Sequence, residues 1–220
     1  MPSAVSDPQR ILDAGIANLG LCLPAGAGTR LVRYLRLLRK WNRVFNLTAI
    51  DEPERMVTHH LLDSLAILPY VRGPRLLDVG SGAGLPGLVI AIAKPELRCA
   101  LLDSVGKKTR FLTQAAIELD LHNVEVINGR MEEHRPAARY DTIVARAFAG
   151  LDEFCRLVVP LMAPGGILLA MKGADPAREI TELRSPGLRC AVHQLHVPGL
   201  DAARHLVAIR ALGAEQAPVQ

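Results

Sequence analysis

The chain has 220 residues, enough for one domain or for one domain with a small partner. Half of the residues are hydrophobic and 22% are charged, which excludes a disordered chain and a coiled coil. No apolar stretch approaches the ~20 residues that cross a bilayer, and the N-terminus lacks the apolar segment of a signal peptide. Four scattered cysteines without a CxxC pair favour a reduced, cytoplasmic chain without a zinc site. The net charge of +4 permits a nucleic-acid partner.

The N-terminal part of the chain is basic and is predicted to be helical. No Asp or Glu occurs between Ala14 and Ile50. The spacing predicts one helix from Arg30 to about Phe45, with Thr29 as its N-cap, and a second helix from Glu54 to Pro69. We expect residues 1–72 to form a small helical extension that packs against the remainder of the chain, since alone it would bury little surface.

After residue 73, short apolar segments alternate with segments of helical pattern. The predicted strands cover residues 75–79, 97–102, 124–127, 142–145, 167–171, 192–197 and 205–209. The predicted helices between them cover residues 85–93, 107–121 and 151–162. This alternation predicts an α/β fold for residues 73–212, with a mostly parallel sheet of seven strands and helices on both of its faces. Residues 213–220 show no periodicity and are expected to be a disordered tail.

A glycine-rich segment, residues 78–87 (the glycine loop), follows the first predicted strand. Its sequence is Asp-Val-Gly-Ser-Gly-Ala-Gly-Leu-Pro-Gly. Glycines let a backbone turn sharply and approach a ligand closely. Asp103 ends the second predicted strand, where doubly wound folds place an acid that accepts hydrogen bonds from ribose hydroxyls. Loop and acid together predict a cofactor that contains adenosine. An ordinary strand–helix turn and a helix-capping Asp are the plainer alternatives.

Two cofactor classes fit this pattern. Dinucleotide-binding enzymes use the spacing GxGxxG, whereas the glycine loop has the more crowded spacing GxGxGxxG. A dinucleotide oxidoreductase is therefore disfavoured. The segment from Asp78 to Gly82 instead resembles motif I of S-adenosylmethionine-dependent methyltransferases. In those enzymes the acid at the position of Asp78 lies near the methionine end of the cofactor.

Several further motifs resemble the RsmG (GidB) family of bacterial rRNA methyltransferases. They occupy residues 41–48, 60–64, 78–87, 101–108, 146–148, 171–173 and 204–207. The resemblance extends from about residue 30 to residue 210, and the segments GLPG and LLDSxGK are uncommon in other methyltransferases. It implies the Rossmann-like methyltransferase fold, S-adenosyl-L-methionine as methyl donor, and N7 of one guanine in bacterial 16S rRNA as acceptor. The 30S subunit is the expected partner, and the sequence leaves open whether naked rRNA or the assembled subunit is the substrate. Ser81 replaces an expected Thr, and Met131 replaces a small aliphatic residue.

The resemblance also implies which residues form the site. Cofactor contacts are expected from Asp78, Gly80, Ser81, Gly82, Gly84, Leu85, Asp103, Ser104, Met131, Glu132 and Arg146. Four residues are expected to act at the target base, namely Arg146, Lys172, Asn46 and His60. Plainer alternatives are a core histidine at residue 60, a surface lysine at 172, a turn-capping asparagine at 46 and a core methionine at 131.

The basic residues of the chain are candidates for contacts with RNA phosphates. They are Arg30, Arg33, Arg36, Arg39, Lys40 and Arg43, which recur at helical spacing, together with Lys107 and Arg130. An ordinary solvated helix face is the alternative interpretation.

The chemistry at guanine N7 makes few demands on the protein. The ring nitrogen carries a lone pair and no proton, so the enzyme mainly has to align donor and acceptor. The sequence contains no [DN]PP[FYW] segment, which acts on exocyclic amines, and no Pro-Cys pair suited to attack on a pyrimidine. Two other functions remain open: a methyltransferase of a small molecule, and a non-catalytic RNA-binding protein of ribosome assembly.

Overall fold

The computed structural model describes residues 7–146, 148 and 150–211. Within them a seven-stranded sheet has the order β3-β2-β1-β4-β5-β7-β6. The strands are β1 (Arg75–Val79), β2 (Arg98–Asp103), β3 (Val124–Asn128), β4 (Tyr140–Arg146), β5 (Met162–Lys172), β6 (Leu188–Leu195) and β7 (Arg204–Ala211). Strands β1 to β5 pair in parallel, and β7 runs antiparallel to both β5 and β6. The predicted fold class, a mostly parallel α/β sheet, is confirmed.

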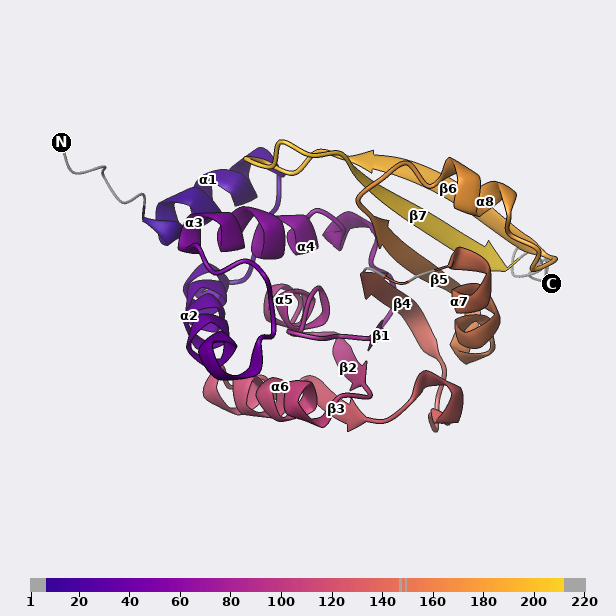
Figure 1. Ribbon diagram of the computed structural model, residues 1–220, viewed down its shortest axis with the longest axis horizontal. Helices are drawn as coiled ribbons and strands as arrows, with labels where there is room; N and C mark the ends of the chain where they lie inside the picture. Colours follow the sequence, from indigo (N-terminus) through magenta and orange to yellow (C-terminus); the bar gives the residue numbers. More distant parts are fainter. Residues whose placement is uncertain (1–6, 147, 149, 212–220) are drawn as a thin grey trace, which may run out of the picture.

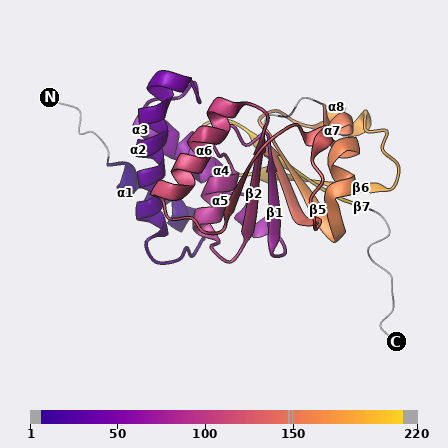
Figure 2. The same ribbon diagram turned by 90° about the horizontal axis from the view of Figure 1, so that it is seen from below.

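Helices cover both faces of this sheet (Figures 1 and 2). They are α1 (Pro8–Asn18), α2 (Ala27–Phe45), α3 (Pro53–Met56), α4 (Asp63–Leu65), α5 (Gly87–Ala93), α6 (Gly106–Glu118), α7 (Leu151–Val158) and α8 (Ala177–Thr181). A π-helical turn, η1 (Val57–Leu62), joins α3 to α4, and short 3₁₀ turns are η2 (Leu68–Tyr70), η3 (Met131–Glu133) and η4 (Val159–Leu161). Figure 2 shows α1 to α6 on one side of the sheet, and α7 and α8 on the other.

Alternation along the strands divides the interior into two cores, because successive side chains of a strand point to opposite faces. Leu76 and Val144 belong to the core shared with α1 to α6, whereas Leu77 and Ile143 belong to the core under α7. The same alternation directs the polar side chains at the strand ends. Arg146, two residues after Val144, faces the N-terminal helices.

The N-terminal helices pack on the sheet's own helices through one continuous core. Leu31 and Leu38 of α2 are fully buried in the cluster that also contains Phe111 of α6. This agrees with the expectation that the helical region cannot bury enough surface alone. The boundary between residues 72 and 73 falls between η2 and β1, and a separate N-terminal domain stays a prediction. The predicted tail, residues 213–220, lies outside the described residues.

Several predicted boundaries need correction. Helix α2 begins at Ala27, after Gly26 in the left-handed conformation (φ 77°), so Thr29 lies inside the first turn and is not the N-cap. The helix predicted from Glu54 to Pro69 is interrupted, because the π turn η1 and the 3₁₀ turn η2 replace regular α-helix. Pro69 lies within η2, where its ring does not have to fit a regular α-helical turn. Among the described residues, no helix is both long and apolar enough to span a membrane.

Candidate functional site

In the first half of the glycine loop, Gly80 is exposed and Gly82 is half-buried. Gly80 and Gly82 have φ values of 67° and 58°, a region that glycine enters without steric cost. A Cβ atom on Gly80 would have no described atom within 4 Å, and one on Gly82 would meet only the Gly80 carbonyl oxygen, at 3.7 Å. These two glycines therefore leave space beside the main chain, as close approach of a ligand requires.

The second half of the glycine loop needs glycine for a different reason. A side chain on Gly84 would collide with Leu88, and one on Gly87 would collide with Leu101 and the Asp78 carboxylate. Both positions are buried. Here the absence of a side chain allows α5 to pack closely on the sheet.

The Asp78 carboxylate is buried beneath the glycine loop. Its Oδ2 accepts a hydrogen bond of 2.9 Å from the Gly87 N–H, while its Oδ1 has no partner among the described residues. Ser81 Oγ donates to the Asp78 carbonyl oxygen at 2.9 Å, which tightens the turn. Burial raises the pKa of Asp78 to about 7. A buried carboxylate oxygen without a partner is costly, and such groups concentrate at functional sites.

Asp103 connects the glycine loop to the next βα turn. Its two carboxylate oxygens accept hydrogen bonds of 2.9 Å from the N–H groups of Gly82 and Val105. The Lys108 ammonium lies 3.8 Å from the Gly82-bound oxygen. Asp103 therefore anchors the glycine loop and also binds the backbone at Val105, just before α6 begins. Ser104 beside it is exposed, and their contacts with a ribose stay a prediction.

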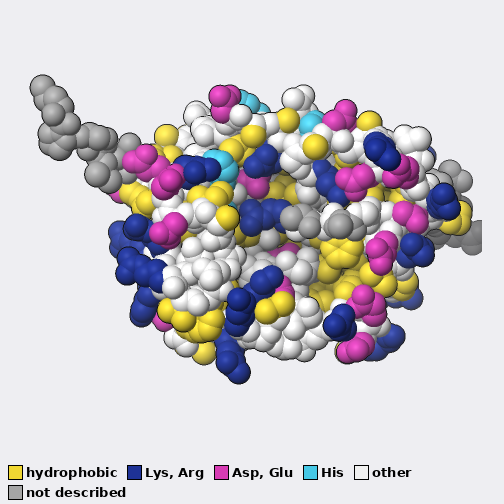
Figure 3. Space-filling view, viewed as in Figure 1, with side chains coloured by type: hydrophobic (Ala, Val, Ile, Leu, Met, Phe, Trp, Pro, Cys, Tyr) yellow, Lys and Arg dark blue, Asp and Glu magenta, His cyan; other side chains and the backbone are white. Residues whose placement is uncertain are grey.

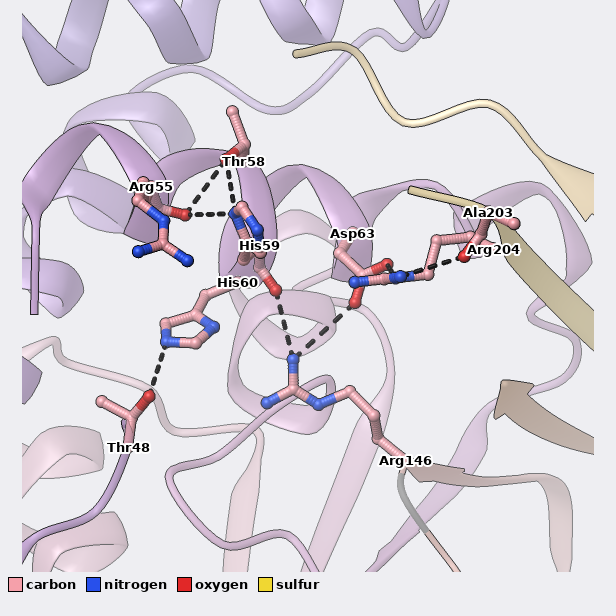
Figure 4. A network of polar contacts seen from close by, with 9 residues as sticks. All are labelled: Thr48, Arg55, Thr58, His59, His60, Asp63, Arg146, Ala203 and Arg204. Carbon is pink, nitrogen blue, oxygen red and sulfur yellow. Dashed lines mark hydrogen bonds and ion pairs between the residues drawn. The ribbon is translucent and has the colours of Figure 1, made fainter. Parts of the chain in front are cut away.

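A charged network lies between the N-terminal helices and the ends of β4 and β7 (Figure 4). Arg146, at the end of β4, donates from Nη1 to the His59 carbonyl at 3.3 Å and lies 3.7 Å from Oδ2 of Asp63. Arg204, at the start of β7, donates from Nε to Oδ1 of Asp63 at 3.0 Å. Burial raises the pKa of Asp63, and the two arginines oppose that shift. One buried carboxylate thus holds two guanidinium groups.

His60 lies beside this network. Its Nε2 is 2.9 Å from Thr48 Oγ1, and its buried Nδ1 has no partner among the described residues. Burial, followed by the charge of Arg146, lowers the pKa of His60 to about 4. The imidazole is therefore neutral near pH 7.

A pocket of about 420 Å³ opens beside these side chains. Its lining consists of Thr48, Ala49, Ile50, His59, His60, Asp63, Arg146, Met171, Lys172, Gly173 and Arg204. Three of the four residues expected to act at a target base are thus brought together. Among the described residues, no group of three or more His, Cys, Asp or Glu side chains is placed to hold a metal ion.

Lys172 is no ordinary surface lysine. Its ammonium donates to Glu179 of α8 at 2.7 Å and to the Phe148 carbonyl at 3.1 Å. Asn46, by contrast, is exposed and lies outside the pocket lining. It ends α2 in the left-handed conformation, and Asn42 accepts the Thr48 N–H at 2.8 Å. The turn-capping contact expected from Asn46 is therefore made by Asn42.

The remaining predicted cofactor residues follow β3 or belong to the glycine loop. Met131 begins η3, half-buried against the core under α7, and Glu132 beside it is exposed. Leu85 is buried in the core shared with α5. The packing alternative for Met131 thus has a physical basis, and its contact with an adenine stays a prediction.

The basic residues of α2 divide into two groups. Arg33 donates to the Glu118 carbonyl at the end of α6 (2.9 Å), and Arg39 donates to the Asp51 carbonyl (3.1 Å), so both have structural roles. The others make no side-chain hydrogen bond or ion pair within the described residues; they are Arg30, Arg36, Lys40 and Arg43. Figure 3 shows Lys and Arg side chains gathered over α2. Lys107 and Arg130 are exposed as well.

Sequence reasoning assigned no role to three residues of this region. Asp63 and Arg204 belong to segments that carry the family resemblance. The sequence therefore marks both residues, but it does not show that they contact each other. Tyr34 of α2 donates its hydroxyl to the Ala83 carbonyl at 2.7 Å. Helical periodicity predicts that Tyr34 is buried, but it cannot show which loop the hydroxyl reaches.

Comparisons with known proteins identify relatives of this chain. The family model described as rRNA small subunit methyltransferase G (GidB) matches residues 28–207. The protein named ribosomal RNA small subunit methyltransferase G from Methylobacillus flagellatus is 50% identical over 90% of this chain and 96% of its own length. The protein of that name from Chromohalobacter salexigens is 53% identical over 90% of this chain and 95% of its own length.

Solved structures share the fold at low identity. The O-methyltransferase TomG from Streptomyces achromogenes, solved with S-adenosylmethionine, superposes with a TM-score of 0.57 at 15% identity, over 94% of this chain and 99% of its own. TrmN from Thermus thermophilus gives a TM-score of 0.54 at 21% identity, over 68% of this chain and 48% of its own. These likenesses identify the fold as that of S-adenosylmethionine-dependent methyltransferases.

Proposed function

Because the chain belongs to the rRNA small subunit methyltransferase G family, we propose that it methylates N7 of one guanine in bacterial 16S rRNA, with S-adenosyl-L-methionine as methyl donor. The observation that carries the proposal is the position of the arginine-lined pocket. Strand β1 pairs with β4, so the glycine loop after β1 neighbours Arg146 at the end of β4. In open parallel sheets, ligands bind outside the carboxyl ends of the strands.

The residues of the glycine loop fit the proposed methyl donor. Gly80 and Gly82 leave open space beside exposed backbone, and Asp78 keeps one buried oxygen without a partner. When bound, the donor supplies a methyl group on a positively charged sulfur. Ser81 holds the turn, Asp103 and Ser104 would meet the ribose, and Met131 with Glu132 would flank the adenine.

The pocket fits a base that is methylated without loss of a proton. Guanine N7 attacks with its lone pair, so the protein has only to bind and orient the ring. His60, whose pKa is lowered to about 4, is a poor proton acceptor, which suits this chemistry. Arg146 retains Nε and Nη2 for guanine O6 or a phosphate, because its described contacts use only Nη1.

Lys172 lines the same pocket, where its ammonium, held by Glu179 and the Phe148 carbonyl, would contact guanine O6 or a phosphate. Asn46 lies two residues before Thr48, in an exposed turn. Its side chain would have to turn toward the pocket to contact the substrate. Lys172 is already in the pocket lining, whereas Asn46 is outside it.

The exposed basic side chains of α2 would bind RNA phosphates, with Lys107 and Arg130 extending the positive surface. The enzyme would then act in the cytoplasm, on 16S rRNA within the 30S subunit or on the free RNA, which the test below distinguishes. The target base would be extruded from the surrounding RNA to enter the pocket, as enzymes that modify bases require.

The test uses 30S subunits and deproteinised 16S rRNA from a bacterial strain that lacks the modification. The purified chain is incubated with radiolabelled S-adenosylmethionine, and the RNA is digested to nucleosides. Label in N7-methylguanosine is the expected result. Label in another nucleoside would refute N7 as the acceptor atom. Cofactor binding without label in either RNA would refute the RNA substrate and favour a small-molecule acceptor or a non-catalytic protein.

A further inference from the structure

We propose that Asp63 is a positioning residue of the reaction: it fixes the guanidinium groups of Arg146 and Arg204 on the wall of the pocket. The inference deepens the proposed function and rests on it for its kinetic consequence. The geometry itself depends only on contacts within the chain.

The three charged residues come from segments far apart in the sequence. Asp63 begins α4, Arg146 ends β4 and Arg204 begins β7, and each arginine uses a different oxygen of the carboxylate. Only 3% of Asp63 is exposed. A buried carboxylate is tolerated when it is paired, and loss of one partner leaves a buried charge uncompensated. The network therefore joins the N-terminal helices to both arginine-bearing strands.

The contacts fix one side of the Arg146 guanidinium and leave the other side available. Nη1 faces Asp63 and the His59 carbonyl, whereas Nε and Nη2 have no hydrogen-bond partner among the described residues (Figure 4). An arginine held in this way presents a planar pair of donors in a set direction. Preorganised donors are worth more than flexible ones, because they lose no side-chain freedom on binding.

The carboxylate also sets the charge of the pocket. Two guanidinium groups without an anion would oppose the positive charge that develops on a guanine ring as N7 is methylated. Asp63 offsets one of the two charges at the point where they meet. Its removal should therefore impair the methyl-transfer step more than the binding of the methyl donor at the glycine loop.

The kinetic test compares Asp63→Asn with Asp152→Asn, a matched control. Asp152 lies across the sheet in α7, where it caps the Arg184 and Ser185 N–H groups and lies 3.4 Å from Arg156. We expect Asp63→Asn to lower kcat by about tenfold or more, with a cofactor Kd within about twofold of the unmodified chain. Asp63→Glu, which keeps the charge, should recover part of kcat. Asp152→Asn should leave kcat unchanged.

A second readout does not depend on activity. The ¹⁵Nε–H signal of Arg204, assigned with the Arg204→Lys variant, reports how tightly Asp63 holds this guanidinium, because Arg204 donates from Nε to Asp63. In the unmodified chain the Arg204 Nε–H should exchange slowly with water, and Asp63→Asn or Asp63→Glu should change that rate. If the chain methylates no RNA, the proposed function fails, but a changed exchange rate still supports the positioning role.

Two results would overturn the inference. One is an Asp63→Asn chain that keeps kcat while the unmodified chain is active on RNA. The other is an Arg204 Nε–H exchange rate in Asp63→Asn that matches the rate in the unmodified chain. If Asp63→Asn fails to fold, Arg204→Lys tests the same contact from its other end with Asp63 intact. It should lower kcat without a matching loss of cofactor affinity, and an unchanged kcat would contradict the proposal.

Discussion

Tyr34, in the middle of α2, donates a hydrogen bond of 2.7 Å to the carbonyl oxygen of Ala83 in the glycine loop. The tyrosine is fully buried, and the two residues are 49 positions apart in the sequence. The helix that carries the basic residues is therefore also a support for the backbone expected to bind the methyl donor. The proposed RNA-binding face and the proposed cofactor loop are thus connected by this hydrogen bond.

Replacement of Tyr34 by Phe tests this connection. The change leaves the buried Ala83 carbonyl without its donor, which should lower the free energy of unfolding by about 1–3 kcal/mol. It should also weaken cofactor binding by about threefold or more, because the loop loses a fixed point. Denaturant unfolding and calorimetric titration measure the two effects. Tyr70→Phe is the control, since the Tyr70 hydroxyl makes no hydrogen bond within the described residues. Equal effects of both variants would contradict the account.

Substitution of Gly80 by Ala should separate ligand binding from backbone strain. Gly80 and Gly165 both have a positive φ (67° and 75°), and no described atom lies near an added Cβ at either. Each Gly→Ala change should destabilise the fold by about 1 kcal/mol. Only Gly80→Ala should weaken cofactor affinity, by about tenfold or more, because its Cβ would occupy the space beside the exposed backbone. Unchanged affinity in Gly80→Ala would remove the first half of the glycine loop from the site.

The unpaired basic residues of α2 should carry RNA affinity. Arg36→Glu combined with Arg43→Glu should weaken binding of 16S rRNA by about tenfold or more and reduce the salt dependence of the affinity. Cofactor affinity should stay the same. Arg98→Glu with Arg139→Glu is the charge-matched control, since both are exposed near the opposite ends of the strands. Arg33 is unsuitable for this test because it caps α6. Equal losses in both double variants would indicate only a general charge effect.

Asp78→Asn should change stability in a pH-dependent way. The pKa of Asp78 is raised from 3.8 to about 7 in the folded chain. Its contribution to stability is therefore complete below about pH 4 and is lost as the pH rises through 7. The Asn variant has no such loss. The free energy of unfolding of the Asn variant, relative to that of the unmodified chain, should therefore rise by up to about 4 kcal/mol between pH 4 and pH 8.

Urea unfolding of both chains at several pH values measures this difference. The same variant should bind the cofactor more weakly, because Asp78 is expected to lie at the methionine end of the donor. If the difference in unfolding free energy between the two chains did not depend on pH, burial would not raise the pKa of the Asp78 carboxyl. A cofactor affinity equal to that of the unmodified chain would assign Asp78 to packing alone.

The central strands were predictable because they are short apolar segments, each followed by a polar or glycine-rich turn. Residues 75–79 form β1 as predicted, and the glycine loop stands between β1 and α5. The ends of elements were less predictable, since they depend on local backbone choices. Gly26 starts α2 a turn earlier than Thr29 would, and Asp120 with a φ of 56° follows the end of α6.

The site could be predicted only in part. Residues of one sequence segment, such as the glycine loop, are near one another by necessity. The pocket instead needs α4, β4 and β7 to meet, which no local pattern shows. The sequence therefore places Asp63 in a motif without identifying its partner, and it predicts Asn46 in a pocket that Asn46 does not line. The sequence does not distinguish Arg33 and Arg39 from the other basic residues of α2. In the structure both donate hydrogen bonds to backbone carbonyl oxygens of other segments.

The most direct test of the account maps the methylated position. 16S rRNA from 30S subunits treated with the chain and S-adenosylmethionine is cleaved chemically at N7-methylguanine, and the break points are read by primer extension. We predict one cleavage site that is absent without the chain and absent with Gly80→Val. No cleavage despite incorporated methyl groups, or cleavage at many guanines, would contradict a single guanine N7 as the acceptor.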